Sequence, residues 1–171
     1  ISLRYAGDVK TLGQPDMVIV PGSKNTMSDL KWMRQNGMEA AILKLAAANV
    51  PVLGICGGYQ MLGESIEDPD GEEGGGSLHG MGLLPVRTVF EKEKVQTRVT
   101  GEILQNPGAG DGLFAALSGS VFSGYEIHMG HTTGNGKNSF SRIRTLTSFP
   151  RPISSLPRQL PATISQSRSS R

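Results

Sequence analysis

The N-terminal half of the chain alternates short apolar runs with helical patterns. Residues 16–20 form an apolar, β-branched run that stops at Pro-Gly-Ser, which is typical of a central parallel strand buried on both faces. An amphipathic helix is expected to begin with Thr26 as its N-cap and to end at residues 36–37, and an Ala- and Leu-rich helix is expected over 38–48. Residues 50–55 form a second buried strand. This alternation predicts an α/β fold on a parallel sheet.

The pattern changes after the first half. Residues 66–80 are acidic and Gly-rich, which predicts a solvated loop. Apolar and polar residues then alternate over 83–90, 95–104 and 121–129 without a long helix between them, which is typical of antiparallel strands. The sheet is therefore expected to be mixed.

The C-terminal segment differs from the rest in composition and charge. Glu126 is the last acidic residue. The charged residues of 137–171 are all basic, and this segment is rich in Ser and Pro. Such a segment buries too little apolar surface to offset its conformational entropy. We expect a domain over 1–134 and a Ser/Pro/Arg-rich, disordered tail over 135–171. The body is net acidic, so nucleic acid is not an expected partner.

One cysteine, Cys56, is present in the 171 residues. This excludes an internal disulfide and a multi-cysteine zinc site, and it favours a reducing compartment. No apolar run is long enough to cross a membrane, and the N-terminus, which lacks an initiator Met, does not resemble a signal peptide. We expect a cytoplasmic protein whose start is missing, with no membrane partner and no metal.

Cys56 lies between a predicted strand and a predicted helix, with Gly54, Gly57 and Gly58 around it. This is the layout of a nucleophile elbow, with sulfur in place of oxygen. A helix N-terminus favours the thiolate, and its free N–H groups can stabilise an oxyanion. Cys56 is therefore a candidate nucleophile for acyl transfer. The alternative is a small, buried, inert thiol.

The loop over 21–25 follows the neighbouring strand, so it should meet the Cys56 turn at the same edge of the sheet. Gly22 could offer a backbone N–H there. The alternative is a plain strand-to-helix connection, and neither common phosphate-binding glycine motif occurs.

A catalytic cysteine usually needs a base, and the chain has three histidines: His79, His128 and His131. His79 lies in the Gly-rich segment and is expected to be solvated. His128 lies on a predicted strand and shares a face with Glu126, so the two could form one pair. Taken alone, a histidine such as His128 or His131 is more often structural than catalytic.

Four segments together resemble the glutamine amidotransferase domain of the cobyric acid synthase (CobQ/CbiP) family of cobalamin biosynthesis. They are PGSKNTMSDLKWMRQNG (21–37), GICGGYQMLG (54–63), MGLLPVRT (81–88) and GYEIHMG (124–130). The resemblance covers residues 8–134 in order and at plausible spacing.

The resemblance implies a class I glutamine amidotransferase-like, flavodoxin-like fold with a mixed, mostly parallel sheet flanked by helices. Cys56 would attack the side-chain amide of L-glutamine, form a thioester and release ammonia. Gly22 and Gly57 would supply oxyanion N–H groups. Gln60 would help to hold the glutamine, and Ser23 would also line the oxyanion and substrate site. The domain itself would hold no cofactor. Ammonia would pass to a ligase domain that uses ATP and Mg²⁺ to amidate a corrinoid, adenosylcobyrinic acid a,c-diamide.

Two features depart from that family. The resemblance leads us to expect a ligase domain with a phosphate loop before Ile1, which the 171 residues do not contain, and residues 131–171 contain nothing like the family's G-T-Y-x-H-G-x-F histidine motif. His128 is then the remaining candidate base. We expect the true C-terminus to have been replaced, for example by a frameshift. The alternatives are a catalytically inactive fragment or pseudoenzyme, and a cysteine hydrolase on a related elbow.

Overall fold

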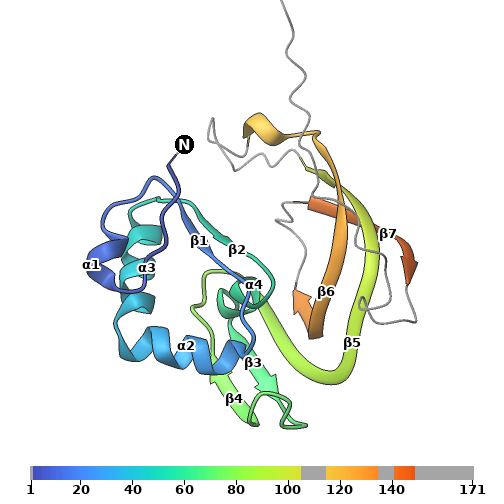
Figure 1. The fold of residues 1–171 in the computed structure, drawn as a ribbon, viewed down its shortest axis with the longest axis horizontal. Coiled ribbons are helices and arrows are strands. Elements are labelled where there is room, and N and C mark those ends of the chain that lie inside the picture. The colour runs from blue at the N-terminus through green and yellow to red at the C-terminus, as the bar shows by residue number, and fades with distance from the viewer. Residues whose placement is uncertain (1, 105–114, 135–140, 149–171) are drawn as a thin grey trace, which may run out of the picture.

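The computed structural model describes residues 2–104, 115–134 and 141–148 (Figure 1). The helices are α1 (Val9–Leu12), α2 (Thr26–Gln35), α3 (Met38–Ala47), α4 (Gly57–Met61) and the 3-10 helix η1 (Ala115–Leu117). The strands are β1 (Val18–Val20), β2 (Val52–Gly54), β3 (Ser65–Asp68), β4 (Gly76–His79), β5 (Val86–Ile103), β6 (Val121–Gly134) and β7 (Ser141–Ser148). No helix within these ranges is long and apolar enough to cross a membrane.

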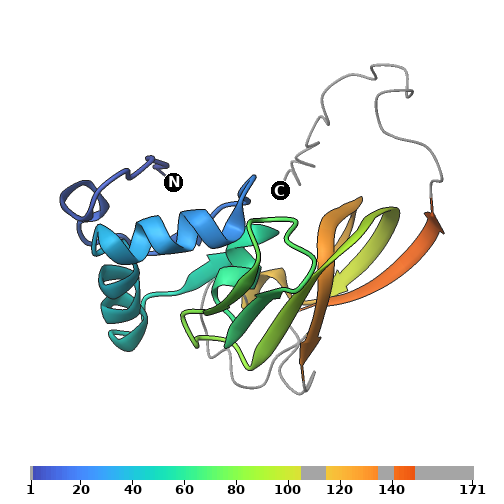
Figure 2. The same ribbon diagram turned by 90° about the horizontal axis from the view of Figure 1, so that it is seen from below.

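The strands form two sheets. β1 and β2 pair in parallel, with Val18 opposite Val52. The second sheet has the order β4-β3-β5-β6, and β7 also pairs with β5. In it β3 and β5 are parallel, whereas the β3–β4, β5–β6 and β5–β7 pairs are antiparallel. Figures 1 and 2 show α1, α2 and α3 on one side of the molecule and the long curved strands on the other. The predicted α/β class with mixed strand directions is confirmed. The expectation of a mostly parallel sheet is wrong for the described strands, because three of their five pairings are antiparallel.

One apolar core joins the two sides. Met61 of α4, Ile66 of β3 and Phe90 of β5 are almost fully buried in the same cluster as the helical residues. The other members of this cluster are Leu12, Val18, Val20, Met27, Leu30, Met38, Ile42, Leu62 and Met81. The short helix α4 is therefore fixed between α2 and the β3–β5 sheet.

The two predicted helices after the first strand are present as α2 and α3. The N-cap of α2 is Asn25, whose side-chain oxygen accepts a hydrogen bond from the Ser28 N–H at 2.8 Å. Our prediction of Thr26 as the cap is wrong by one residue. Thr26 already lies inside the helix, and its side chain is buried.

β1 is shorter and less buried than predicted. Val18 and Val20 are buried, but Ile19 between them is 44% exposed. Within the described residues β1 pairs with β2 alone. The expectation of a central strand buried on both faces is therefore wrong for this strand, which leaves one face and one edge open.

The acidic segment 66–80 is a β-hairpin rather than a solvated loop. β3 and β4 pair antiparallel from Ser65 opposite His79 to Asp68 opposite Gly76. The turn between them uses left-handed backbone at several glycines, including Gly71, with φ of 78°. The glycines thus serve the turn, and the prediction of a solvated loop is wrong.

Asp68 organises this turn from inside. Its side chain is fully buried, and its carboxylate accepts hydrogen bonds from the N–H groups of Glu72, Glu73 and Gly75 at 2.9, 2.7 and 2.8 Å. Burial raises the pKa of Asp68, but the N–H donors of Glu73, Gly75, Glu72 and Gly71 together outweigh it and hold the pKa below the usual 3.8. The ionised carboxylate therefore stabilises the turn.

The antiparallel strands predicted for the second half are present, as β5 and β6. They pair along most of their length, with a bulge between Val89 and Lys94 of β5. β7 pairs with β5 and falls inside the segment 135–171, so our expectation of disorder is wrong for residues 141–148. Residues 135–140 and 149–171 lie outside the described residues, and the domain boundary at 134 stays a prediction.

The contact between α4 and β1 predicts a strong steric effect at Gly58. A Cβ on Gly58 would lie 2.0 Å from the Val20 carbonyl oxygen, so Gly58→Ala must push the two elements apart. We expect it to lower the free energy of unfolding by about 3 kcal/mol in urea titrations. Gly124→Ala is the control, because a Cβ there meets nothing within 4 Å. Equal stability of the two variants would contradict this packing.

The Asp68 turn predicts a pH-dependent contribution to stability. Because the folded pKa is below the unfolded value of about 3.8, the carboxylate stabilises the fold above that pH, and this contribution is lost as pH falls through the folded pKa. We expect Asp68→Asn to be less stable than the unaltered chain at neutral pH, with the difference shrinking in acid. Urea unfolding at several pH values measures it. A difference that does not depend on pH would contradict the role of the charge.

Candidate nucleophile site at Cys56

Cys56 has the backbone conformation of a nucleophile elbow. Its φ is 52° and its ψ is −114°, and it is the residue between β2 and α4. A side chain at positive φ costs on the order of 1–3 kcal/mol and is held only where the surroundings impose it. Here the Ile55 N–H is bound by the Val20 carbonyl and the Gly58 N–H by the Ile55 carbonyl, each at 2.9 Å. The turn leaves Cys56 exposed at the N-terminus of α4.

The glycines around Cys56 are required by space, as the sequence predicted. A Cβ on Gly54 would lie 2.6 Å from the backbone nitrogen of Tyr59. A Cβ on Gly57 would lie 3.0 Å from Thr26 Oγ1 and 3.1 Å from the Ser23 nitrogen. The elbow therefore packs directly against its own helix and against the loop over 21–25, which we name the β1–α2 loop.

The β1–α2 loop meets the elbow, as predicted for loops that follow neighbouring parallel strands. A Cβ on Gly22 would lie 3.5 Å from the Cβ of Cys56. Within the described part of the chain, no acceptor binds the backbone N–H of Gly22 or of Gly57. Two backbone donors thus remain available beside the sulfur.

Ser23 uses its side chain within the loop itself. Its hydroxyl donates to Asp29 Oδ2 at 2.5 Å and accepts from the Asn25 N–H at 3.0 Å. Ser23 is therefore placed beside Gly57, but its hydroxyl stabilises the start of α2.

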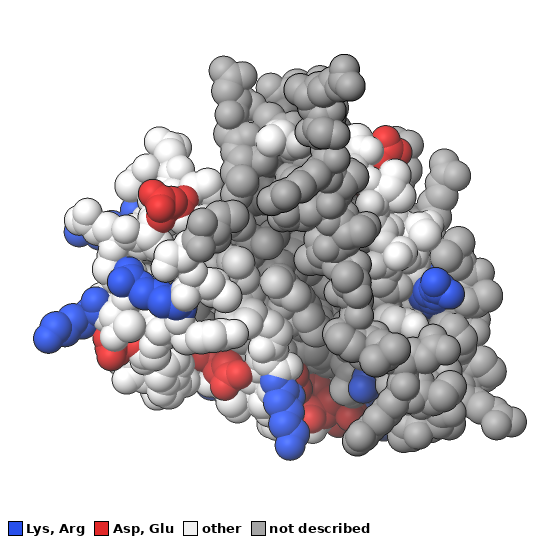
Figure 3. Space-filling view, turned by 45° about the horizontal axis from the view of Figure 1, so that its top comes forward, with Lys and Arg blue, Asp and Glu red and all other residues white. Residues whose placement is uncertain are grey.

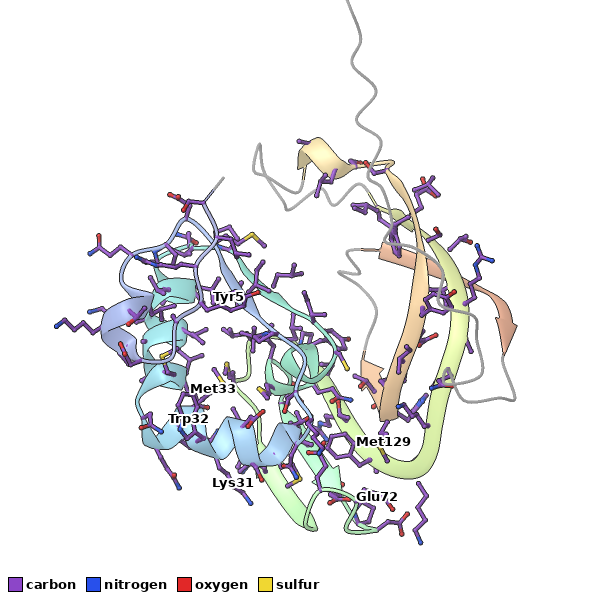
Figure 4. The ribbon with its side chains drawn as sticks, in the orientation of Figure 1. Tyr5, Lys31, Trp32, Met33, Glu72 and Met129 are labelled. Atoms are coloured by element: carbon purple, nitrogen blue, oxygen red, sulfur yellow. The ribbon has the colours of Figure 1, made fainter. Side chains whose placement is uncertain are left out.

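Strand β6 contacts the elbow through its backbone carbonyls. The Cys56 thiol donates to the Ile127 carbonyl with a sulfur–oxygen distance of 3.6 Å. Gln60, which is buried, donates from Nε2 to the carbonyl of Met129 at 3.1 Å; Met129 is labelled in Figure 4. The segment GYEIHMG is thus brought to Cys56, and Gln60 is a link to β6.

The His128 side chain is not directed at Cys56. Its Nε2 lies 2.9 Å from Glu126 Oε1, and its Nδ1 lies 3.0 Å from the Gly130 carbonyl. Glu126 in turn accepts from the Thr97 hydroxyl at 3.1 Å across the β5–β6 pair. The predicted Glu126–His128 pair is confirmed. Both ring nitrogens of His128 face oxygen atoms other than those of the elbow, so its role as base stays a prediction.

The other two histidines are exposed. His79, as predicted, is accessible to solvent on β4, and His131 is exposed on β6. Next to the elbow, burial raises the pKa of Tyr59, which favours the neutral phenol. No cluster of three or more metal-ligating side chains occurs in residues 2–104, 115–134 and 141–148.

Sequence reasoning missed Glu73. Its carboxylate accepts the Met27 N–H of α2 at 2.9 Å, and its carbonyl accepts from Asn25 Nδ2 at 3.4 Å. The two segments lie far apart in the sequence, and no local pattern indicates that they meet.

Figure 3 shows basic and acidic side chains interspersed over the described part of one face.

Comparison with known proteins shows which family the chain belongs to. Residues 1–149 match the family of CobB/CobQ-like glutamine amidotransferase domains. Cobyric acid synthase of Ruminiclostridium cellulolyticum is 54% identical over 155 residues, which cover 88% of this chain and 29% of that protein. Cobyric acid synthase of Lachnoclostridium phytofermentans is 51% identical over 137 residues, which cover 80% of this chain and 26% of that protein.

A solved structure described as a glutamine amidotransferase aligns with 79% of this chain and 62% of its own, with a TM-score of 0.49 and 18% identity. The chain spans 26% to 29% of the length of the two relatives named above. Because the family match covers most of the chain, the protein belongs to the family of CobB/CobQ-like glutamine amidotransferase domains.

Proposed function

We propose that Cys56 is the nucleophile of a glutaminase site that hydrolyses L-glutamine. One observation carries the proposal: an exposed thiol held at positive φ on a helix N-terminus, beside the N–H groups of Gly22 and Gly57, to which no acceptor among the described residues binds. A site for acyl transfer needs this combination of nucleophile and oxyanion donors. The family supports glutamine as the acyl donor.

The reaction has two halves. The Cys56 thiolate attacks the side-chain amide carbon, and the carbonyl oxygen becomes an oxyanion that accepts from the N–H groups of Gly22 and Gly57. The C–N bond then breaks, the nitrogen takes the proton that the Cys56 thiol gave up before the attack, ammonia departs, and a γ-glutamyl thioester remains. Water adds to the thioester carbon, the C–S bond breaks, one proton of the water returns to the sulfur, and glutamate leaves. The N–H donors act in both halves because each passes through an oxyanion.

Gln60 and Ser23 shape the substrate side of this site. Gln60 fixes the Met129 carbonyl of β6, and Ser23 fixes the loop that carries Gly22. Both residues therefore help to hold glutamine through the backbone segments that they position. The domain itself needs no cofactor for this hydrolysis.

The ammonia is used by a ligase. The relatives are named cobyric acid synthases and are more than three times as long as the matched segment, so they have room for a second catalytic domain. We assign to that domain the use of ATP and Mg²⁺ to activate a corrinoid carboxylate, adenosylcobyrinic acid a,c-diamide, for amidation in cobalamin biosynthesis. This chain would supply the ammonia in the cytoplasm.

A second candidate function is a catalytically inactive module that keeps the elbow but lacks a base. The observation that favours it is the placement of His128, whose ring nitrogens face Glu126 and Gly130 while the thiol contacts Ile127. A carbonyl cannot accept the thiol proton at neutral pH. Labelling and turnover separate the two candidates.

An activated Cys56 is expected to react selectively with a glutamine-like electrophile. 6-Diazo-5-oxo-L-norleucine would form a thioether with the sulfur and release dinitrogen, and Cys56 is the single cysteine of the chain, so mass spectrometry reads the site directly. At about pH 6.5 we expect labelling at least about tenfold faster than in the urea-unfolded chain, whose thiol is ordinary. L-Glutamine should slow this labelling and D-glutamine should not. Labelling that L-glutamine does not slow would contradict a glutaminase site.

Ammonia release from L-glutamine tests the base. We expect Cys56→Ala to abolish release. We expect His128→Ala to keep release within about threefold, because the His128 ring faces Glu126 and Gly130 instead of Cys56. Loss of a working general base would instead cost about 100-fold or more. A loss of about 100-fold in His128→Ala, with an unchanged circular dichroism spectrum, would identify His128 as the base. No release by the unaltered chain, together with glutamine-specific labelling, would support the inactive module.

A further inference from the structure

Glu73 reaches from the β3–β4 turn to the first turn of α2. Its carboxylate accepts the N–H of Met27, which is the second residue of the helix, and its backbone carbonyl accepts from the side chain of Asn25. A carboxylate at this position also interacts favourably with the positive end of the helix. Figure 1 shows the β3–β4 turn beside the end of α2 where the β1–α2 loop enters.

The segment that Glu73 holds is the one that packs on the elbow. Asn25 caps α2, and its N–H is also bound by the Ser23 hydroxyl. Atoms of Thr26 and Ser23 are the nearest that a Cβ on Gly57 would meet, and a Cβ on Gly22 would meet Cys56. A chain of direct contacts thus leads from Glu73 through Asn25 and Ser23 to both candidate oxyanion donors.

Glu73 is itself fixed, and its neighbour Glu72 is not used in this way. The Glu73 N–H is bound to the buried Asp68 carboxylate at 2.7 Å, so the residue is anchored on both its backbone and its side chain. Glu72, labelled in Figure 4, is exposed, and the contact that its backbone makes to Asp68 does not depend on its side chain. The two neighbouring glutamates therefore form a matched pair for substitution.

We propose that Glu73 is a positioning residue of the glutaminase site, which holds the β1–α2 loop so that the Gly22 N–H stays aimed at the oxyanion. This inference rests on the proposed function. Glu73 contacts neither Cys56 nor the N–H groups of Gly22 and Gly57 directly, and it acts through Met27 and Asn25. Displacing an oxyanion donor by a fraction of its hydrogen-bond length weakens it in the transition state more than in the ground state.

The test compares Glu73→Ala and Glu73→Gln with Glu72→Ala in the full chain. The measurement is saturable labelling of Cys56 by 6-diazo-5-oxo-L-norleucine, which gives a maximal rate and a half-saturating concentration. We expect Glu73→Ala to lower the maximal rate about tenfold and to change the half-saturating concentration less than about twofold. Glu73→Gln should fall between, because its amide oxygen can still accept from Met27. Glu72→Ala should match the unaltered chain.

Two further readouts separate positioning from damage to the fold. The glutamine-like reagent must bind with its ketone oxygen at the N–H groups of Gly22 and Gly57 before the sulfur displaces dinitrogen, whereas iodoacetamide alkylates a thiol without binding there. The iodoacetamide rate should therefore stay within about twofold in every variant. Amide hydrogen exchange over residues 22–27 should rise in Glu73→Ala and not in Glu72→Ala. Equal losses with both reagents, or faster exchange without any loss of glutamine-like labelling, would overturn the positioning role alone. Labelling of the unaltered chain that L-glutamine does not slow would instead overturn the proposed function, and the positioning role with it.

Discussion

The backbone of α4 passes the end of β1 with no room for a side chain between them, and the candidate site depends on this contact. A Cβ on Gly58 would lie 2.0 Å from the Val20 oxygen. The Ile55 N–H is bound to that same oxygen, so the chain must turn within Cys56 to begin α4, and it does so at positive φ. The elbow is thus a consequence of how closely the helix approaches the strand. Its cost is offset by the burial of Met61, the last residue of α4, and of Leu62, which caps the helix.

Acidic residues that usually face water here organise backbone donors. Asp68 gathers the N–H groups of the β3–β4 turn, and Glu73 takes one N–H from the first turn of α2. Each carboxylate satisfies donors that would otherwise have no partner in a turn or at a helix end. The hairpin and α2 are thereby joined by polar contacts, in addition to the apolar core that they share. This arrangement holds Asn25 at the end of the β1–α2 loop and the first turn of α2.

Local patterns in the sequence predicted what local forces determine. The helices over 26–36 and 38–48, the elbow glycines and the Glu126–His128 pair all follow from spacing between near neighbours. The hairpin over 65–79 was missed because its charge and glycine content were interpreted as solvation, whereas Asp68 is buried by contacts that only the closed turn creates. The contact of Glu73 with α2 joins segments distant in the sequence, and nothing in either segment alone indicates it. β7 is not predicted from the sequence, because it forms by pairing with β5 and the composition of its own segment does not indicate a strand.

β6 contributes to the site with its backbone more than with its histidine. The carbonyls of Ile127 and Met129 accept from Cys56 and Gln60, which fixes the strand against the elbow at two points with one residue between them. A thiol that donates to a carbonyl still carries its proton, so nucleophilic attack requires that the proton move to a group more basic than an amide oxygen. His128 could take it only after breaking one of its bonds to Glu126 or Gly130 and turning toward the sulfur. The N–H groups proposed as oxyanion donors lie next to Cys56 at rest, whereas proton removal requires a movement or a further group. The acid–base step is therefore the part of the proposed chemistry that separates an active glutaminase from an inactive module.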